Sequence, residues 1–259
     1  MKPTNQLASI LFIVLISLVS FPIFAAKNDC KLTLGYDSWE PYQYLDVGNQ
    51  VRGLDIEILL MVAERMPCKI EYAQGSWVDL LSRMRKGEID VLLGASKTSK
   101  REQFALFSVP YRTEQFALYV REDDKASRRL TSFNEFIAQD KKLGVVGDYF
   151  YGNKLSDLRD KDEDKHFVDA IISEMNIARL LDENIDAFLE DSIVGASMIR
   201  RKGLSSLIVP HGLSITTGDV YVMFSRKSVS PVTLANFNRH LKKVVESDDF
   251  EALIKLYKH

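Results

Sequence analysis

The chain has 259 residues, of which 46% are hydrophobic and 27% are charged, and its formal net charge is −2 at pH 7. This composition excludes the disordered and fibrous classes and allows one large domain or two small ones. The slightly acidic balance argues against a nucleic acid or an anionic membrane as partner.

The N-terminus has the features of a secretory signal peptide. Lys2 precedes an apolar run over residues 10–19, and Ala25 and Ala26 offer a small residue for cleavage. A transmembrane anchor is the alternative, but the run is shorter than the ~20 residues that a bilayer requires. We therefore expect residues 1–26 to be removed and the mature protein to be secreted.

Secretion places Cys30 and Cys68 in an oxidising compartment, where a pair of cysteines usually forms a disulfide. Each cysteine lies just before a run with strand-like alternation of apolar residues. If these two strands are adjacent and parallel, the sulfur atoms are neighbours, and we predict a disulfide. Two buried free thiols are the alternative.

Strands and helices alternate along the chain, which predicts βαβ units and a mainly parallel sheet. Asp55 is the expected N-cap of the first helix, and Ser76 and Gly87 are the expected cap and stop of the second. A solvated loop is expected over residues 157–165. The expected strands cover 31–37, 68–74, 88–94, 116–123, 142–147, 166–171, 185–191 and 220–227. The expected helices cover 53–66, 76–87, 132–139, a segment from about Tyr149, 173–184, 192–203 and closing helices over 231–257.

Two stretches of the chain resemble each other. Residues 88–96 and 184–192 share isoleucine, aspartate, leucine and serine at matching places, four of nine positions. The match is short, but it fits two lobes of related build.

The end of the strand at Gly94 has features of a ligand site. In open parallel sheets, ligands bind at the carboxyl ends of the strands. Gly94 lets the backbone approach a ligand, and Ser96 offers a hydroxyl. Arg101 follows in the first turn of a short helix, where the helix dipole disfavours a cation unless an anion is near. A bound carboxylate would supply that anion, while a surface Arg101 paired with Glu102 is the alternative.

Six segments together carry a family resemblance: "SWEPYQY", "GLDIEILLMVAERM", "GEIDVLLGASKTSKRE", "FSVPY", "LGVVGDYFYG" and "IDAFLED". They resemble the family 3 extracellular solute-binding proteins, which serve polar amino-acid uptake, and the resemblance spans about Leu32 to Tyr257. It implies a two-lobed α/β periplasmic-binding-protein fold, in which each lobe is a mainly parallel sheet flanked by helices. It further implies lobe 1 over 27–120, lobe 2 over 121–214 and a return to lobe 1 over 215–259. The two hinge strands would cross near 119–121 and 215–221.

The resemblance also implies roles for site residues. Ser96 and Arg101 would hold the α-carboxylate of an amino acid, Gly94 would make a backbone contact, and Asp191 would receive the α-ammonium group. For Asp191, a purely structural role as N-cap of the helix at Ser192 is the alternative.

Aromatic residues complete the implied site. Trp39 would pack on the ligand side chain, with Tyr42 close behind it. Packing of Trp39 in the core or at the hinge is the alternative. Trp77 either lines the cleft or only packs against its own helix.

One position departs from the family pattern. After the strand at 143–146 the family commonly has glycine followed by threonine or serine, whereas this chain has Gly147 and Asp148. Either Asp148 turns away as N-cap of the helix expected at Tyr149, or the ligand differs. Asp148, Glu190 and Asp191 together would suit a cation, which favours a basic amino acid and leaves open a ligand without a carboxylate.

The sequence thus predicts a periplasmic protein that captures a small amine-containing solute, preferably an amino acid, for a membrane ABC transporter. We expect a monomer without cofactor or metal, and the four histidines lack the close spacing of metal ligands. The partner would be a permease or a membrane sensor. A cyclohexadienyl-dehydratase-like enzyme on the same fold, with Glu190 or Asp191 as acid or base, is the alternative. Part of a cell-wall lytic enzyme is disfavoured, because no second domain is expected after His259.

Overall fold

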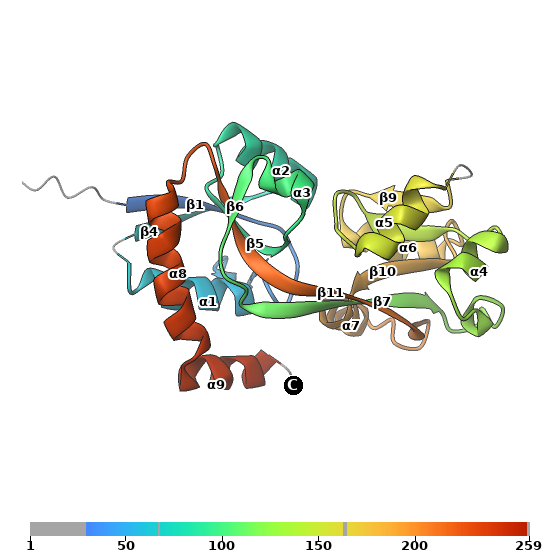
Figure 1. Cartoon of the computed structure of the whole chain (residues 1–259). Coiled ribbons are helices and arrows are strands. Elements are labelled where there is room, and N and C mark those ends of the chain that lie inside the picture. Colours follow the sequence, from blue (N-terminus) through green and yellow to red (C-terminus); the bar gives the residue numbers. More distant parts are fainter. Residues whose placement is uncertain (1–29, 67, 163–164, 258–259) are drawn as a thin grey trace, which may run out of the picture.

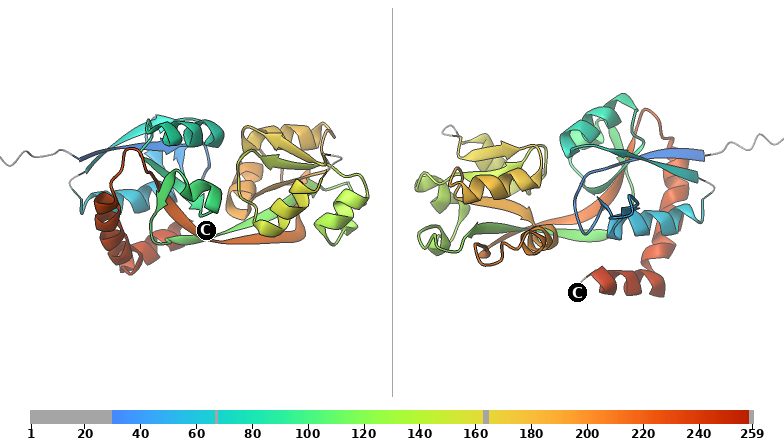
Figure 2. Two further views of the ribbon diagram at one scale, coloured as in Figure 1. Left: turned by 45° about the horizontal axis from the view of Figure 1, so that its top comes forward. Right: turned by 180° about the vertical axis from the view of Figure 1, so that it is seen from behind.

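The alternating pattern of strands and helices builds two α/β lobes in the computed structural model (Figure 1), which describes residues 30–66, 68–162 and 165–257. The lobes are joined by β7 (Arg112–Arg121) and β11 (Ile208–Ser225). Figure 2 shows the lobes on either side of these two strands. The expected signal peptide lies outside the described residues, and none of the helices within them is long and apolar enough to cross a membrane.

Lobe 1 takes its elements from both ends of the chain. Its strands are β1 (Cys30–Tyr36), β4 (Cys68–Gln74), β5 (Val91–Ser96) and β6 (Ala105–Phe107), with a separate hairpin of β2 (Tyr44–Leu45) and β3 (Val51–Arg52). Its helices are α1 (Leu54–Ala63), α2 (Trp77–Lys86), α3 (Ser99–Glu102), α8 (Pro231–Val245) and α9 (Asp248–Tyr257).

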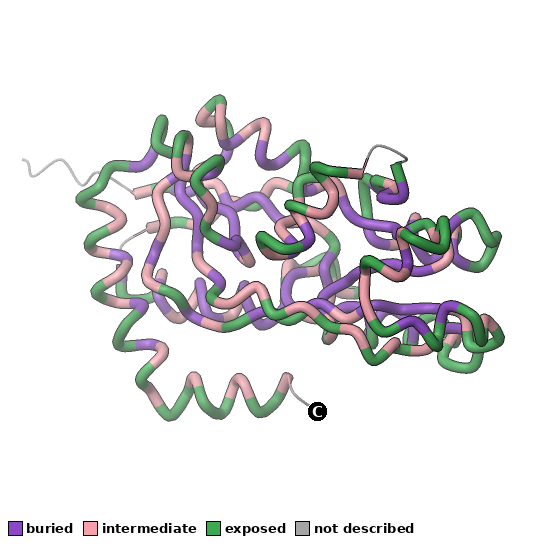
Figure 3. Tube along the Cα trace, turned by 45° about the vertical axis from the view of Figure 1, so that its right-hand side comes forward, coloured by how far each residue is buried: buried purple, intermediate pink, exposed green. Residues whose placement is uncertain are grey.

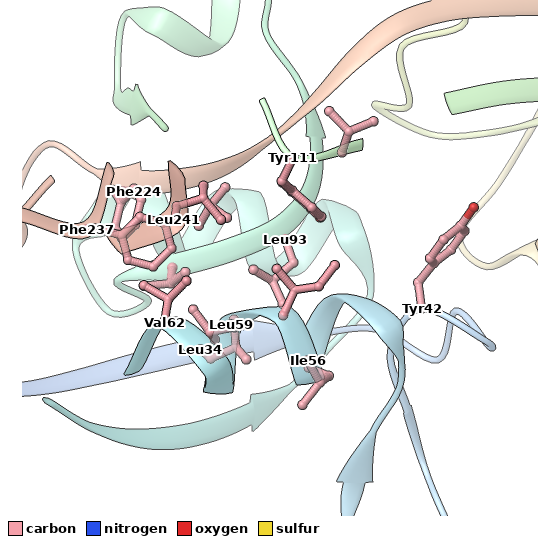
Figure 4. Close-up of a cluster of buried hydrophobic side chains, with 14 of the residues drawn as sticks. Leu34, Tyr42, Ile56, Leu59, Val62, Leu93, Tyr111, Phe224, Phe237 and Leu241 are labelled. Atoms are coloured by element: carbon pink, nitrogen blue, oxygen red, sulfur yellow. The ribbon is translucent and has the colours of Figure 1, made fainter. Parts of the chain in front are cut away.

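Strand β5 is buried on both faces, as its apolar run predicts. Leu93 packs in the core that α1 and α8 form on one face, with Phe237 among its members. Leu92 packs on the other face in a core that includes Leu80 of α2. Figure 4 shows the first core, with Phe237 and Leu241 at one end and Tyr42 at the other.

Lobe 2 is built in the same way from the middle of the chain. Its strands are β8 (Leu143–Val146), β9 (Phe167–Ala170) and β10 (Ala187–Asp191). Its helices are α4 (Phe133–Ala138), α5 (Asn153–Asp160), α6 (Ser173–Leu181) and α7 (Ser192–Arg201), with a 3-10 turn at Ser127–Arg129. Two cores cover the two faces of its strands, and Figure 3 shows the buried segments gathered along the strands of both lobes.

A single sheet runs through both lobes in the order β4-β1-β5-β11-β7-β10-β8-β9, and β6 pairs with β11 off this path. In each lobe three strands are parallel, and one crossing strand is antiparallel to them: β11 pairs with β5, and β7 pairs with β10. The stretches 88–96 and 184–192 contain β5 and β10. Segments with matching sequence therefore take equivalent places in the two lobes.

The crossing strands pair with each other between the lobes. Arg112 of β7 lies opposite Val220, and Phe116 is the first residue of β7 that pairs with β10. The register of β11 shifts between Thr216 and Gly218, and Gly218 has a φ of +94° that favours glycine. The lobe boundaries expected at 120/121 and 214/215 stay predictions.

The predicted disulfide is confirmed. Cys30 and Cys68 are the first residues of β1 and β4, lie opposite each other in the parallel register, and are bonded. The bond closes the loop that carries α1.

We expect the Cys30→Ala/Cys68→Ala variant to lose about 3–4 kcal/mol of unfolding free energy, because the open chain regains the entropy of a loop of roughly 39 residues. The bonded residues are 38 positions apart. Urea unfolding of the oxidised protein, the reduced protein and the variant measures this loss. Equal stability of the oxidised protein and the variant would contradict the entropic argument.

Two local expectations are wrong. The helix expected from about Tyr149 begins at Asn153 and continues to Asp160, so residues 157–160 of the segment expected as a solvated loop are helical. Gly152 is the N-cap residue, and its φ of +86° is not helical, so the helix does not extend toward Tyr149. Asp55 does not cap α1, because Gly53 occupies the N-cap position and the Asp55 carboxylate is paired with Arg112.

Candidate functional site

A cavity lies between the lobes, at the carboxyl ends of β1 and β5 and beside the segment that follows β8. Its volume is about 30 Å³, which is the scale of water molecules and not of an amino acid. An amino acid therefore fits between the lobes only if the lobes or the lining side chains move. The cavity is lined by Asp37, Trp39, Gln43, Trp77, Leu93, Gly94, Ser96, Arg101, Glu114, Phe116, Tyr149 and Phe150.

Arg101 is buried at this cavity, not exposed beside Glu102. The N-cap of α3 is Thr98, whose Oγ1 accepts a hydrogen bond from the amide of Arg101 at 3.2 Å. Nη1 of Arg101 donates to the carbonyl of Ser96 at 2.7 Å, and the guanidinium lies 5.2 Å from the ring centre of Trp77. Burial lowers the pKa of Arg101 to about 10, so the group stays charged at neutral pH.

Asp148 meets Arg101 through its backbone. Its carbonyl accepts hydrogen bonds from Nη2 of Arg101 at 2.8 Å and from the indole of Trp77 at 3.3 Å. Its carboxylate points to the rim, 3.6 Å from Nζ of Lys100. The side chain does turn away from the cavity, but its expected role as a helix N-cap is wrong, because its φ is +59° and α5 begins at Asn153.

Trp39 connects the two lobes. Its indole nitrogen donates a hydrogen bond to Oε1 of Glu190 in lobe 2 at 3.1 Å. A Cβ atom at Gly94, where φ is +71°, would lie 2.9 Å from the Trp39 ring. Glycine at position 94 therefore lets the indole lie over the end of β5, while the Gly94 amide donates to the hydroxyl of Tyr111.

Two buried carboxylates lie around the cavity. Glu114 accepts hydrogen bonds at one oxygen from Ser96 and Thr217, and burial raises its pKa to about 7. Glu190 accepts from Trp39 and from the amide of Asp191, and burial raises its pKa to about 7 as well. Oε2 of Glu190 has no hydrogen-bond partner in the described part of the chain.

Two residues named from the resemblance do not line the cavity. Asp191 is the N-cap of α7, since its Oδ1 accepts from the amides of Ile193 and Val194. Tyr42 packs on Trp39 and lies under the guanidinium of Arg112, 3.9 Å from the ring centre. The structure thus brings Trp39, Gly94, Ser96 and Arg101 together at the cavity, with the carbonyl of Asp148.

Sequence reasoning missed Glu114, Gln43 and Tyr149. A signal for Glu114 exists, because β7 alternates and Glu114 takes a position in the buried series that continues with Phe116 and Leu118. An acid in the buried series of a strand needs a partner or a function. Nothing local in the sequence distinguishes Gln43 or Tyr149.

The raised pKa of Glu190 makes stability depend on pH. Its ordinary pKa is 4.5, so the unfolded chain loses this proton between about pH 4.5 and 7 while the folded protein keeps it. Stability therefore falls as pH rises through this window, by up to about 3 kcal/mol for this group. We expect Glu190→Gln to reduce the difference in unfolding free energy between pH 5 and pH 8 by roughly 2 kcal/mol.

Urea unfolding at the two pH values measures the effect of Glu190→Gln, and Glu183→Gln, at an exposed acid of the same lobe, is the control. Glu114 contributes in the same direction, so part of the slope remains in the variant. An unchanged slope in Glu190→Gln would show that Glu190 is ionised in the folded protein.

Comparison with known proteins agrees with this geometry. The model of the bacterial extracellular solute-binding proteins, family 3, matches residues 32–258. A probable histidine-binding protein of Neisseria gonorrhoeae is 24% identical over 231 residues, which cover 84% of this chain and 78% of that protein.

Solved structures agree on the fold. The arginine-, lysine-, histidine-binding protein ArtJ from Geobacillus stearothermophilus has a TM-score of 0.74 at 19% identity, with 88% of this chain and 94% of that chain covered. A histidine kinase sensor domain with similarity to periplasmic binding proteins has a TM-score of 0.75 at 20% identity, with 88% and 95% covered. Since the family match spans nearly all of the described residues, the chain belongs to family 3 of the bacterial extracellular solute-binding proteins.

Proposed function

We propose that this solute-binding protein captures a small amine-containing solute, preferably a basic amino acid, between its two lobes. The buried guanidinium of Arg101 at the cavity carries the proposal. It is charged, it belongs to lobe 1, and it reaches a carbonyl of lobe 2. A solute carboxylate that replaced this carbonyl would form charge-assisted hydrogen bonds with the guanidinium.

Closure of the lobes follows from contacts on both sides of the solute. Lobe 1 binds first through Arg101 and Ser96, and lobe 2 then adds groups near Glu190 and Asp191. A ligand drives closure only by binding the closed form more tightly than the open form. The cross-lobe hydrogen bond between Trp39 and Glu190 then stabilises the closed form.

The resemblance implies hinges near 119–121 and 215–221; from the strand pairing we place the first bend earlier, at residues 113–115 of β7, and the second at 216–219 of β11. These residues lie between the part of β7 that pairs with β10 and the part of β11 that pairs with β5. The register shift of β11 and the positive φ of Gly218 fall in the same segment. Hinges are a few residues that absorb large changes of φ and ψ.

The proposed location is the periplasm, after removal of residues 1–26, and the proposed form is a monomer that performs no chemistry. A membrane ABC transporter is the proposed partner that recognises the closed form. The relatives support an amino-acid ligand, since they include a probable histidine-binding protein and an ancestral arginine-binding protein bound to arginine. A membrane sensor is the second candidate partner, since the histidine kinase sensor domain has a similar fold.

A thermal-shift screen of the mature oxidised protein tests the proposed function. The screen uses the twenty amino acids, common polyamines and prephenate, because a ligand that binds the native state raises the melting temperature. A shift with one or more amino acids supports the proposal. A shift with polyamines alone would contradict the role of Arg101, and turnover of prephenate would support the dehydratase-like alternative.

A further inference from the structure

Glu114 lies in β7 between the lobes, and the sequence motifs of the family resemblance do not include it. Its side chain is buried. Its Oε2 accepts from the hydroxyl of Thr217 at 2.9 Å and from the hydroxyl of Ser96 at 3.4 Å. Its Oε1 makes no hydrogen bond to any of the described residues, and the side chain lines the cavity.

The two hydroxyls come from different elements. Ser96 ends β5, at the expected carboxylate site. Thr217 lies at the register shift of β11, because Thr216 is opposite Gln115 and Gly218 is opposite Glu114. The Glu114 carboxylate therefore connects the end of β5 in lobe 1 with the register shift of β11.

Two hydrogen-bond acceptors of the cavity lining, Oε1 of Glu114 and Oε1 of Gln43, have no hydrogen bond to the described residues. Oε1 of Gln43 is buried without a partner among the described residues, and the carboxylate of Asp37 also lines the cavity. On the donor side, both terminal nitrogens of Arg101 already donate to backbone carbonyls. A bound group with several N–H donors would therefore satisfy acceptors that this arrangement leaves open.

Formal charges favour a cation as well. The charged groups that face Glu114 are Arg112, Arg101 and Asp191. Arg112 is neutralised by its two hydrogen bonds to Asp55. The acids that line the cavity are Asp37 and Glu114, so together with Arg101 the formal charge of the lining is 1 − 2 = −1 when both acids are ionised.

We propose that Glu114 is the specificity-determining residue that binds the positively charged side-chain group of the solute and transmits this binding to the hinge through Thr217. This inference rests on the proposed function. It adds that the Glu114 side of the site distinguishes charged from neutral solute side chains. Arg101 and Ser96 hold the carboxylate of the solute. Glu114 and Gln43 receive an ammonium or guanidinium group.

Binding of cationic solutes compared with neutral analogues of similar size tests the role of Glu114. Calorimetry at pH 8 measures the dissociation constants of L-arginine against L-citrulline and of L-lysine against L-glutamine. It uses the unmodified protein, Glu114→Gln and Glu122→Gln. Glu122 follows the end of the same strand and is exposed, where it pairs with Arg128, so Glu122→Gln is the matched control.

We expect the unmodified protein to bind at least one cationic solute about tenfold or more tightly than its neutral analogue, a difference of about 1.4 kcal/mol. In Glu114→Gln the ratio falls to within about threefold, while Glu122→Gln keeps the original ratio. We expect Thr217→Val to keep the ratio of the two dissociation constants above about fivefold. The variant weakens the binding of both solutes, because it removes only the link between Glu114 and the hinge.

Two other results would overturn the inference. A ratio that persists in a folded Glu114→Gln variant excludes Glu114 as the selecting residue. Tighter binding of neutral amino acids by the unmodified protein excludes a cation site and leaves the proposed function intact. If neither an amino acid nor a polyamine binds in the thermal-shift screen, the proposed function itself fails.

Discussion

Asp55→Ala is expected to lower the free energy of unfolding by about 3–5 kcal/mol, because it leaves the buried charge of Arg112 unpaired. The Asp55 carboxylate accepts two hydrogen bonds from Arg112, at 2.9 and 3.0 Å. The side chains of Arg112 and Asp55 are 6% and 0% exposed, so the ion pair is largely shielded from water. The aromatic rings of Tyr42 and Tyr111 lie against the guanidinium and offer no anion.

Urea unfolding at pH 7 measures this loss, and the double variant Asp55→Leu/Arg112→Met is its control. Replacing both members of a buried ion pair by apolar residues is often close to neutral, so we expect the double variant to be more stable than Asp55→Ala. A loss below about 1 kcal/mol in Asp55→Ala, the scale of an exposed ion pair, would mean that Arg112 finds another partner or reaches water.

Arg101→Met is expected to weaken binding of the amino acid found in the screen by at least about 30-fold, which corresponds to about 2 kcal/mol. The variant removes the cation at the proposed carboxylate site and the contact from lobe 1 to the carbonyl of Asp148. Methionine keeps the packing on Trp77 without the charge. The expected loss of affinity comes from the direct contact, because the solute carboxylate would replace the carbonyl of Asp148 at the guanidinium.

Calorimetry with the screened amino acid measures this change, and Lys100→Ala is the matched control. Lys100 precedes Arg101 in the same short helix, but its side chain is 75% exposed and pairs with the Asp148 carboxylate at the rim. We expect its removal to change affinity by less than about threefold. Equal effects of the two variants would mean that general positive charge near the cleft, and not the buried guanidinium, attracts the solute.

Much of the fold could be predicted because its determinants are local. The alternation in the runs after Cys30 and Cys68 predicts two strands, and the oxidising compartment predicts the bond between them. Ser76 caps α2 and Gly87 ends it, as their residue types predict. The short strand β6 and the hairpin of β2 and β3 carry no comparable pattern.

The candidate site could be predicted only where one strand and its loop determine it. Gly94, Ser96 and Arg101 lie within eight residues of sequence, and all three reach the cavity. The bond between Trp39 and Glu190 joins residues 151 positions apart and depends on how the lobes meet. Asp148 misleads for a related reason: its residue type suggests a cap, whereas its left-handed backbone directs the carbonyl toward Arg101.

The pairing of the two crossing strands indicates how lobes could be exchanged between related proteins. Because Gln115 and Thr216 lie opposite each other, the chain leaves lobe 1 and re-enters it at neighbouring points. Insertions whose ends lie close together are well tolerated by a host domain. We therefore expect residues 116–215 to be exchangeable as one segment: the second lobe of a relative, joined at the same two points, would replace the solute contacts of lobe 2 and keep Arg101 and the disulfide. Such chimaeras would separate the part of ligand choice made by each lobe.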